Sequence, residues 1–129
     1  MKTTAKKVDP KRINVPNICF SLIAHGDKRE GDFAKQRLER GFDDSETWSL
    51  DITIAKFILP RLKRFKEVAH TYPASMTRKQ WGGKLDKMIE AMELVIKNTS
   101  GSDVMTKREL KKMPDGLNLF ASHFLYLWW

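Results

Sequence analysis

The feature that most constrains the fold is a long run of apolar side chains at helical spacing between Arg40 and His70. Asp43 followed by Glu46 has the spacing of a capping box, which predicts a helix from Asp44 to about Ala69. At about 100° per residue, the polar side chains fall on one narrow strip and apolar side chains cover the rest of the helix. The strip comprises Ser49, Thr53, Lys56, Pro60, Lys63 and Glu67. So wide an apolar arc indicates the central helix of a bundle.

The positions of three residues in this run allow specific structural predictions. Pro60 lies on the polar strip, where water can replace the lost amide bond, so it predicts a kink and not a break. Trp48 lies on the apolar arc and is expected to be buried. Asp51 projects from the same arc, where an unpaired carboxylate would be costly. We therefore expect Asp51 to form a structural ion pair with Arg37 or Arg40, the alternative being a catalytic carboxylate.

The rest of the chain reads as shorter helices around this one. Residues 17–24 are ambiguous between a strand and a helix, and residues 27–40 predict an exposed helix ending at Gly41. Capping boxes predict helix starts at Thr77 and at Thr106, and the second of these helices is short and closed by Pro114 to Gly116. The sequence thus predicts an all-α, single-domain bundle over residues 13–129, with residues 1–12 as a loose basic arm.

The final segment predicts one more helix with two different faces. Its core face is expected to carry Leu117, Phe120, Ala121, Phe124, Leu125 and Trp128. Leu119, Tyr126 and Trp129 fall on another side, which suggests either a homo-oligomer contact or a crowded chain end.

Charge favours an acidic partner. The 129 residues carry a formal net charge of +8, which suits nucleic acid, nucleotides or acidic protein surfaces. The single cysteine, Cys19, excludes an intramolecular disulfide framework and a cysteine-based zinc cluster. Because no signal peptide or membrane span is visible, we expect a soluble protein of a reducing cytoplasm, without a membrane partner.

The stretches KQRLERGFDDSETWSLD, LDKMIEAMELV and GLNLFASHFLYLW together resemble a group of small proteins encoded by tailed bacteriophages. The recurring elements are R-G-[FY]-x-x-x-[DE]-T-W-x-L-D and a closing G-L-x-L-F with a terminal tryptophan. They are represented here by Arg40, Gly41, Trp48, Asp51, Gly116, Leu117 and Phe120. The resemblance covers about the last three quarters of the chain. It implies phage origin and a host cytoplasm, but it assigns no reaction and no catalytic residue.

An enzymatic function has little motif support. A small metal-dependent enzyme would draw on Asp43, Asp44, Glu46 and Asp51 together with His25, His70 or His123. These residues form no zinc-protease, phosphate-loop or nucleophile-elbow motif. Asp43 and Glu46 are already explained by the helix start. We therefore expect no catalytic residues, no cofactor and no metal.

Non-enzymatic binding is the favoured function. Lys56, Arg61, Lys63, Arg64 and Lys66 follow one another without an intervening acid, although such a run is usually only a solvated face. The expected ligand-binding residues are Arg37, Arg40, Lys56, Arg61, Lys63 and Arg64. Lys107, Arg108, Lys111 and Lys112 form a further basic cluster. The favoured function is sequestration of an anionic ligand, such as a nucleotide signal, in antagonism of host defence. Binding of nucleic acid and inhibition of an acidic host protein are the alternatives.

Overall fold

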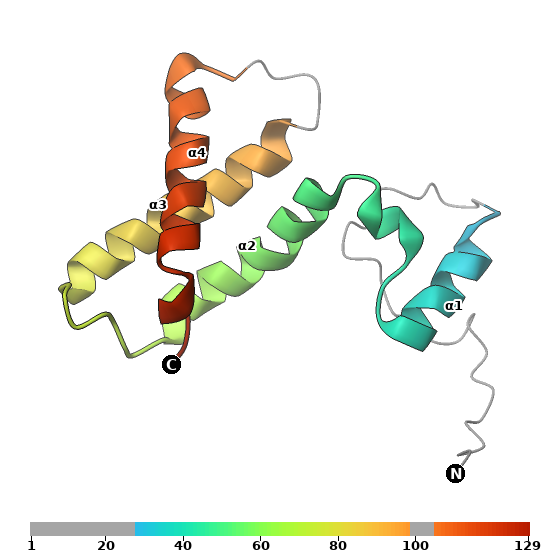
Figure 1. The fold of residues 1–129 in the computed structure, drawn as a ribbon, viewed down its shortest axis with the longest axis horizontal. Coiled ribbons are helices and arrows are strands. Elements are labelled where there is room, and N and C mark those ends of the chain that lie inside the picture. Colours follow the sequence, from blue (N-terminus) through green and yellow to red (C-terminus); the bar gives the residue numbers. More distant parts are fainter. Residues whose placement is uncertain (1–27, 99–104) are drawn as a thin grey trace, which may run out of the picture. The chain divides into compact units, whose positions relative to one another are not determined.

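The computed structural model describes residues 28–98 and 105–129, and within these ranges it contains helices and no strand (Figure 1). The predicted all-α helical bundle is therefore confirmed. The elements are α1 (Glu30–Arg40), the 3-10 turn η1 (Asp44–Thr47), α2 (Leu50–Val68), α3 (Arg78–Lys97), α4 (Lys107–Ser122) and the 3-10 turn η3 (Phe124–Tyr126). Contacts divide the chain into two compact units, residues 1–53 and 54–129, with the boundary inside α2. The expected arm 1–12 and the segment 17–24 lie outside the described residues.

The first element described in the first unit is α1, which ends as predicted at Gly41. This glycine has φ of 87°, a left-handed conformation, and its amide donates to the Arg37 carbonyl. The predicted capping box of Asp43 and Glu46 is present, but it caps η1 and not a long α-helix. The prediction of a helix from Asp44 is thus wrong, because a 3-10 turn and two turn residues precede α2. The predicted end near Ala69 is confirmed within one residue.

This late start explains why Trp48 is not buried. Trp48 lies before α2, is 51% exposed and makes an edge contact with Phe33, with 5.8 Å between ring centroids. The buried and exposed positions of α2 also differ from the prediction. Thr53, predicted to face solvent, is buried and donates to the Glu46 carbonyl at 2.7 Å. Ile54 and Phe57, predicted to be buried, are exposed. The helix continues through exposed Pro60 without a break, as predicted.

The second unit packs α2, α3 and α4 around one hydrophobic core. Its buried centre consists of Leu62, Trp81, Leu85 and Met88. The capping box of Thr77 and Gln80 starts α3 as predicted. Within the described ranges, no helix combines the length and apolar character that crossing a bilayer requires.

The helix α4 differs most from its prediction. It starts at the predicted capping box of Thr106 and Glu109, but it runs through Pro114 as one helix where two were expected. The pKa of Glu109 is lowered because the Thr106 backbone amide and then the Lys97 ammonium bond its carboxylate. Packing explains the continuity: α4 crosses α3 (Figure 1), and buried Gly116 lies directly against the Lys87 carbonyl. This tertiary contact outweighs the local preference for a helix end.

The end of the chain also corrects the sequence-based assignment of faces. The helix stops at Ser122, and four residues of the predicted core face are exposed: Ala121, Phe124, Leu125 and Trp128. Leu119, which was assigned to a contact surface, packs against the core instead. Phe124, Leu125 and Trp128 leave the core face because η3 interrupts the α-helical phase on which their assignment depended.

Candidate anion-binding site

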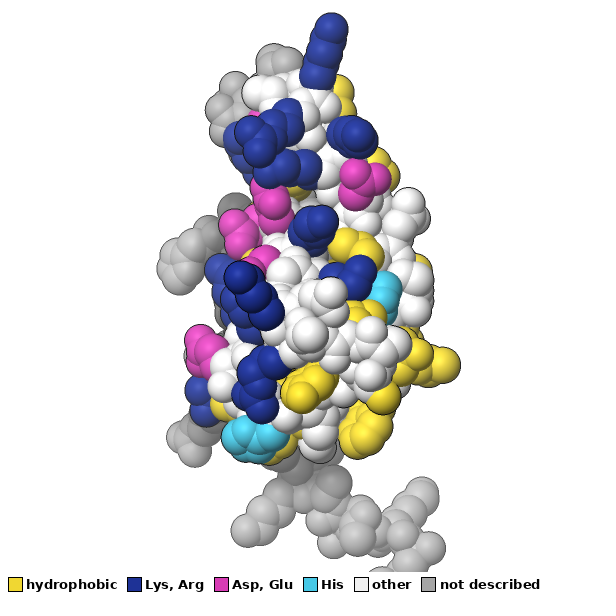
Figure 2. All heavy atoms as spheres, turned by 90° about the vertical axis from the view of Figure 1, so that its left-hand side faces the viewer, with side chains coloured by type: hydrophobic (Ala, Val, Ile, Leu, Met, Phe, Trp, Pro, Cys, Tyr) yellow, Lys and Arg dark blue, Asp and Glu magenta, His cyan; other side chains and the backbone are white. Residues whose placement is uncertain are grey.

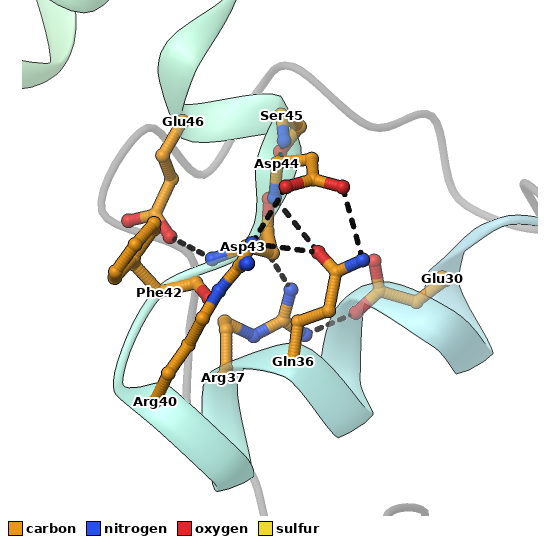
Figure 3. Close-up of polar contacts among 9 residues, drawn as sticks. All are labelled: Glu30, Gln36, Arg37, Arg40, Phe42, Asp43, Asp44, Ser45 and Glu46. Atoms are coloured by element: carbon orange, nitrogen blue, oxygen red, sulfur yellow. Dashed lines mark hydrogen bonds and ion pairs between the residues drawn. The ribbon is translucent and has the colours of Figure 1, made fainter.

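Arg37, the first of the predicted ligand-binding residues, is buried in an ion-pair cluster. Its guanidinium donates to Asp43 at 2.5 Å and to Glu30, as Figure 3 shows. Burial alone would lower the pKa of Arg37, but the hydrogen bonds to Glu30 and Asp43 outweigh it, so the pKa is raised. Asp43 also accepts the amide of Ser45 at 2.8 Å. With its donors held by two carboxylates, this arginine fixes the turn after α1.

Arg40, the second predicted arginine, forms an exposed cluster at the end of α1. It donates to Asp44 at 2.6 Å and to the Phe42 carbonyl at 3.0 Å. Gln36 donates to the same Asp44 carboxylate at 3.1 Å (Figure 3). The hydrogen bond from Arg40 lowers the pKa of Asp44 below its ordinary value.

The predicted pairing of Asp51 with Arg37 or Arg40 is wrong. Asp51 is exposed in the first turn of α2, and both arginines pair with other carboxylates. The error has the same origin as that at Trp48, because a helix assumed to begin at Asp44 places Asp51 on the wrong face. Exposed in a first turn, Asp51 complements the helix dipole and needs no ionic partner.

The basic run of α2 is interleaved with acids that the linear sequence separates from it. Lys63 lies 3.8 Å from Glu93, and Lys66 lies 2.5 Å from Asp86, both acids belonging to α3. On the side of the molecule drawn in Figure 2, Asp and Glu side chains likewise lie among Lys and Arg side chains. The helix therefore does not present the uninterrupted positive strip that its sequence indicates.

The remaining cations of the run are engaged locally. Arg64 bonds Glu67 of its own helix at 3.0 Å. Arg61 donates to the Phe57 carbonyl at 2.9 Å and stacks on the Phe57 ring, 3.9 Å from its centroid. Lys56 is half-buried. Arg37 and Arg40 belong to the first unit, and the other predicted ligand residues belong to the second.

A different set of cations gathers in a groove between α3 and α4. The groove has a volume of about 860 Å³, within the range of small-molecule sites. Its lining consists of Lys87 and Glu90 from α3 and of Arg108, Lys111, Lys112, Asp115, Gly116, Asn118, Leu119 and Ser122 from α4. The α4 residues recur every three or four positions, so they form one face of that helix.

Three of the four cations in this groove have no acidic partner among the described residues. Lys112 is held by Glu90 at 3.0 Å, whereas Lys87, Arg108 and Lys111 form no ion pair in the described parts of the chain. Unpaired lysine and arginine donors from two helices can bind phosphate oxygens or carboxylates. The groove is thus the better candidate anion site.

Three of the four cations of this groove were visible in the sequence as one cluster. Arg108, Lys111 and Lys112 were recognised as a basic cluster, but Lys87 lies on another helix with no local signal. The recurrence of polar residues along α4 was hidden because the segment was divided at Pro114.

The residues considered for a metal-dependent enzyme do not assemble in the described ranges. No group of three His, Cys, Asp or Glu side chains there could hold a metal ion. His123 is half-buried, with its ring 5.9 Å from that of Trp81 and its Nδ1 3.0 Å from the Leu119 carbonyl oxygen. His70 makes an edge contact with Trp129 at 5.9 Å, and His25 lies outside the described residues.

Comparisons of the chain with protein-family models, with curated proteins and with solved structures found no match.

Proposed function

We propose that the protein binds a phosphate-bearing anion in the groove between α3 and α4 without transforming it chemically. The observation that carries the proposal is the convergence of Lys87, Arg108 and Lys111, all without acidic partners among the described residues, on a concave surface. A concave site excludes part of the water around a ligand, so each charge-assisted hydrogen bond there is worth more than on an open face.

The proposed biological role is sequestration of a nucleotide signal, with antagonism of host defence during phage infection. Its support is the resemblance to phage proteins, the net charge of +8 and the absence of a recognised catalytic motif in the sequence. Sequestration requires only that the ligand is held and released intact. The proposed location is the host cytoplasm.

The test is isothermal titration calorimetry with mononucleotides and cyclic nucleotides. In the variant Arg108→Gln with Lys111→Gln, we expect affinity to fall about tenfold or more, because two charge-assisted bonds are lost. The matched control is Lys63→Gln with Arg64→Gln, which removes the same charge from the basic run of α2. If only the control variant loses affinity, the site lies on α2 as the sequence alone suggested. Recovery of a chemically altered nucleotide would refute binding without chemistry.

Nucleic-acid binding is the second candidate function. It is favoured by four cations in the first two turns of α4: Lys107, Arg108, Lys111 and Lys112. A phosphate backbone bound there would give an affinity that falls steeply with salt and depends little on the base. The same titrations at two salt concentrations with short DNA and RNA decide between the candidates. If no nucleotide or nucleic acid binds, an acidic host protein becomes the partner to seek.

A further inference from the structure

Charge is divided unequally along the groove between α3 and α4. Arg108 and Lys111 lie in the first turns of α4, while Asp115, Asn118 and Ser122 lie in its second half. At 1.5 Å per residue, Arg108 and Asp115 are separated by about 10 Å along the helix. The groove therefore has a cationic end, where Lys112 pairs with Glu90, and a polar end that carries Asp115.

The two ends have different binding chemistry. An ionised carboxylate only accepts hydrogen bonds, so Asp115 attracts hydroxyl and amino donors and repels phosphate. No described residue forms a hydrogen bond with the Asp115 carboxylate or with the side-chain amide of Asn118. Ser122 donates to the Asn118 backbone carbonyl at 2.8 Å, and its hydroxyl oxygen also lies 3.0 Å from the His123 Nδ1, so this side chain is engaged within the protein.

We infer that the ligand is a sugar phosphate unit, with its phosphate at Arg108 and Lys111 and its hydroxyl groups at Asp115 and Asn118. The inference rests on the proposed anion-binding function and specifies its ligand class. A pentose phosphate, alone or as part of a nucleotide, has a length comparable to the separation of the two ends. Lys87 of α3 also lines the groove, and its backbone carbonyl lies against Gly116, the residue after Asp115.

This division of charge also argues against a continuous phosphate backbone as the ligand. A chain with a phosphate at every unit would place one of them near Asp115, where like charges repel. Among the described residues of the lining there is no aromatic side chain on which bases could stack. Recognition therefore depends on phosphate and sugar, and the base contributes little.

The experiment is a two-dimensional amide NMR titration of the full chain with ribose 5-phosphate, 2-deoxyribose 5-phosphate, inorganic phosphate and a short single-stranded DNA. We expect ribose 5-phosphate to bind about tenfold more tightly than inorganic phosphate, as one charge-assisted hydrogen bond implies. In Asp115→Asn this preference should shrink by a similar factor, while DNA affinity should rise. The control is Asp51→Asn, which makes the same charge change outside the groove and should leave the ratio unchanged.

The outcomes separate the two proposals. If no ligand shifts resonances of the groove, anion binding itself is refuted. If phosphate binds there but Asp115→Asn strengthens ribose 5-phosphate and inorganic phosphate equally, the carboxylate acts only through net charge and the sugar phosphate inference is overturned. Equal shifts in Asp51→Asn would likewise show that the effect is not local to the groove.

Discussion

The close approach of α3 and α4 at Gly116 makes one substitution especially informative. A Cβ atom at this position would lie closer than 3.0 Å to the Ala91 Cβ and to the Lys87 carbonyl oxygen. A backbone oxygen cannot rotate away as a flexible side chain can, so Gly116→Ala must push the two helices apart. The expected result is a lower free energy of unfolding.

The magnitude follows from two opposing effects. Alanine is favoured over glycine in a helix interior by about 1 kcal/mol. Overpacking of a tight contact costs about 1–3 kcal/mol, and two contacts on one atom place this site at the upper end. We therefore expect Gly116→Ala to destabilise by about 2 kcal/mol, measured by urea unfolding with circular dichroism.

The matched control is Gly83→Ala in α3, where an added Cβ would meet no atom within 4 Å. Here only the helix preference acts, so the variant should gain about 0.5–1 kcal/mol. The same substitution thus has opposite signs at the two positions. Adding Ala91→Gly to Gly116→Ala should restore part of the loss, which a double-mutant cycle measures. If Gly116→Ala is as stable as Gly83→Ala, the helices are not in contact as described.

Three further predictions concern the first unit. Asp43→Asn should cost about 3 kcal/mol in urea unfolding, because the buried Arg37 guanidinium loses an ionic partner; an unchanged stability would contradict the buried pair. Trp48→Ala should cost about 1–2 kcal/mol, less than the roughly 3–5 kcal/mol of a buried aromatic side chain, and a loss in the larger range would show a covered ring. Asp44 has a pKa below its ordinary value of 3.8, so its bond with Arg40 stabilises the fold above that pH and is lost as pH falls through the lower, folded-state pKa. Acid titration of the Asp44 carboxyl by NMR should show this lowered midpoint, and Arg40→Gln should return it toward 3.8.

Much of the local structure could be predicted from the sequence, because capping boxes are local signals. Those at Asp43, Thr77 and Thr106 are all present. The type of helix that follows the capping box at Asp43 could not be predicted, since a 3-10 turn and an α-helix share the same capping chemistry at their first residues. The predictions that Trp48 is buried and that Asp51 pairs with Arg37 or Arg40 were both wrong because they assumed an α-helix from Asp44.

The candidate site depended on information that no local pattern carries. The run from Lys56 to Lys66 was read as free positive charge because Asp86 and Glu93 are distant in sequence. Conversely, Pro114 indicated a helix end by its local chemistry alone. That prediction was wrong because the contact that keeps α4 continuous comes from α3. Both errors arise from tertiary packing between helices, which a single-sequence pattern does not contain.

The unequal exposure of the tryptophans gives the two units separate optical reporters. Trp48 is the only tryptophan in residues 1–53, while Trp81 is buried in the core of the second unit at 4% exposure. Opening of the second unit would transfer the Trp81 indole to water and shift its emission to longer wavelength, whereas the half-exposed Trp48 would change less. A chain in which Trp48 is replaced by Phe would therefore follow the second unit, and comparison with the unmodified chain would show whether both halves melt in one cooperative step.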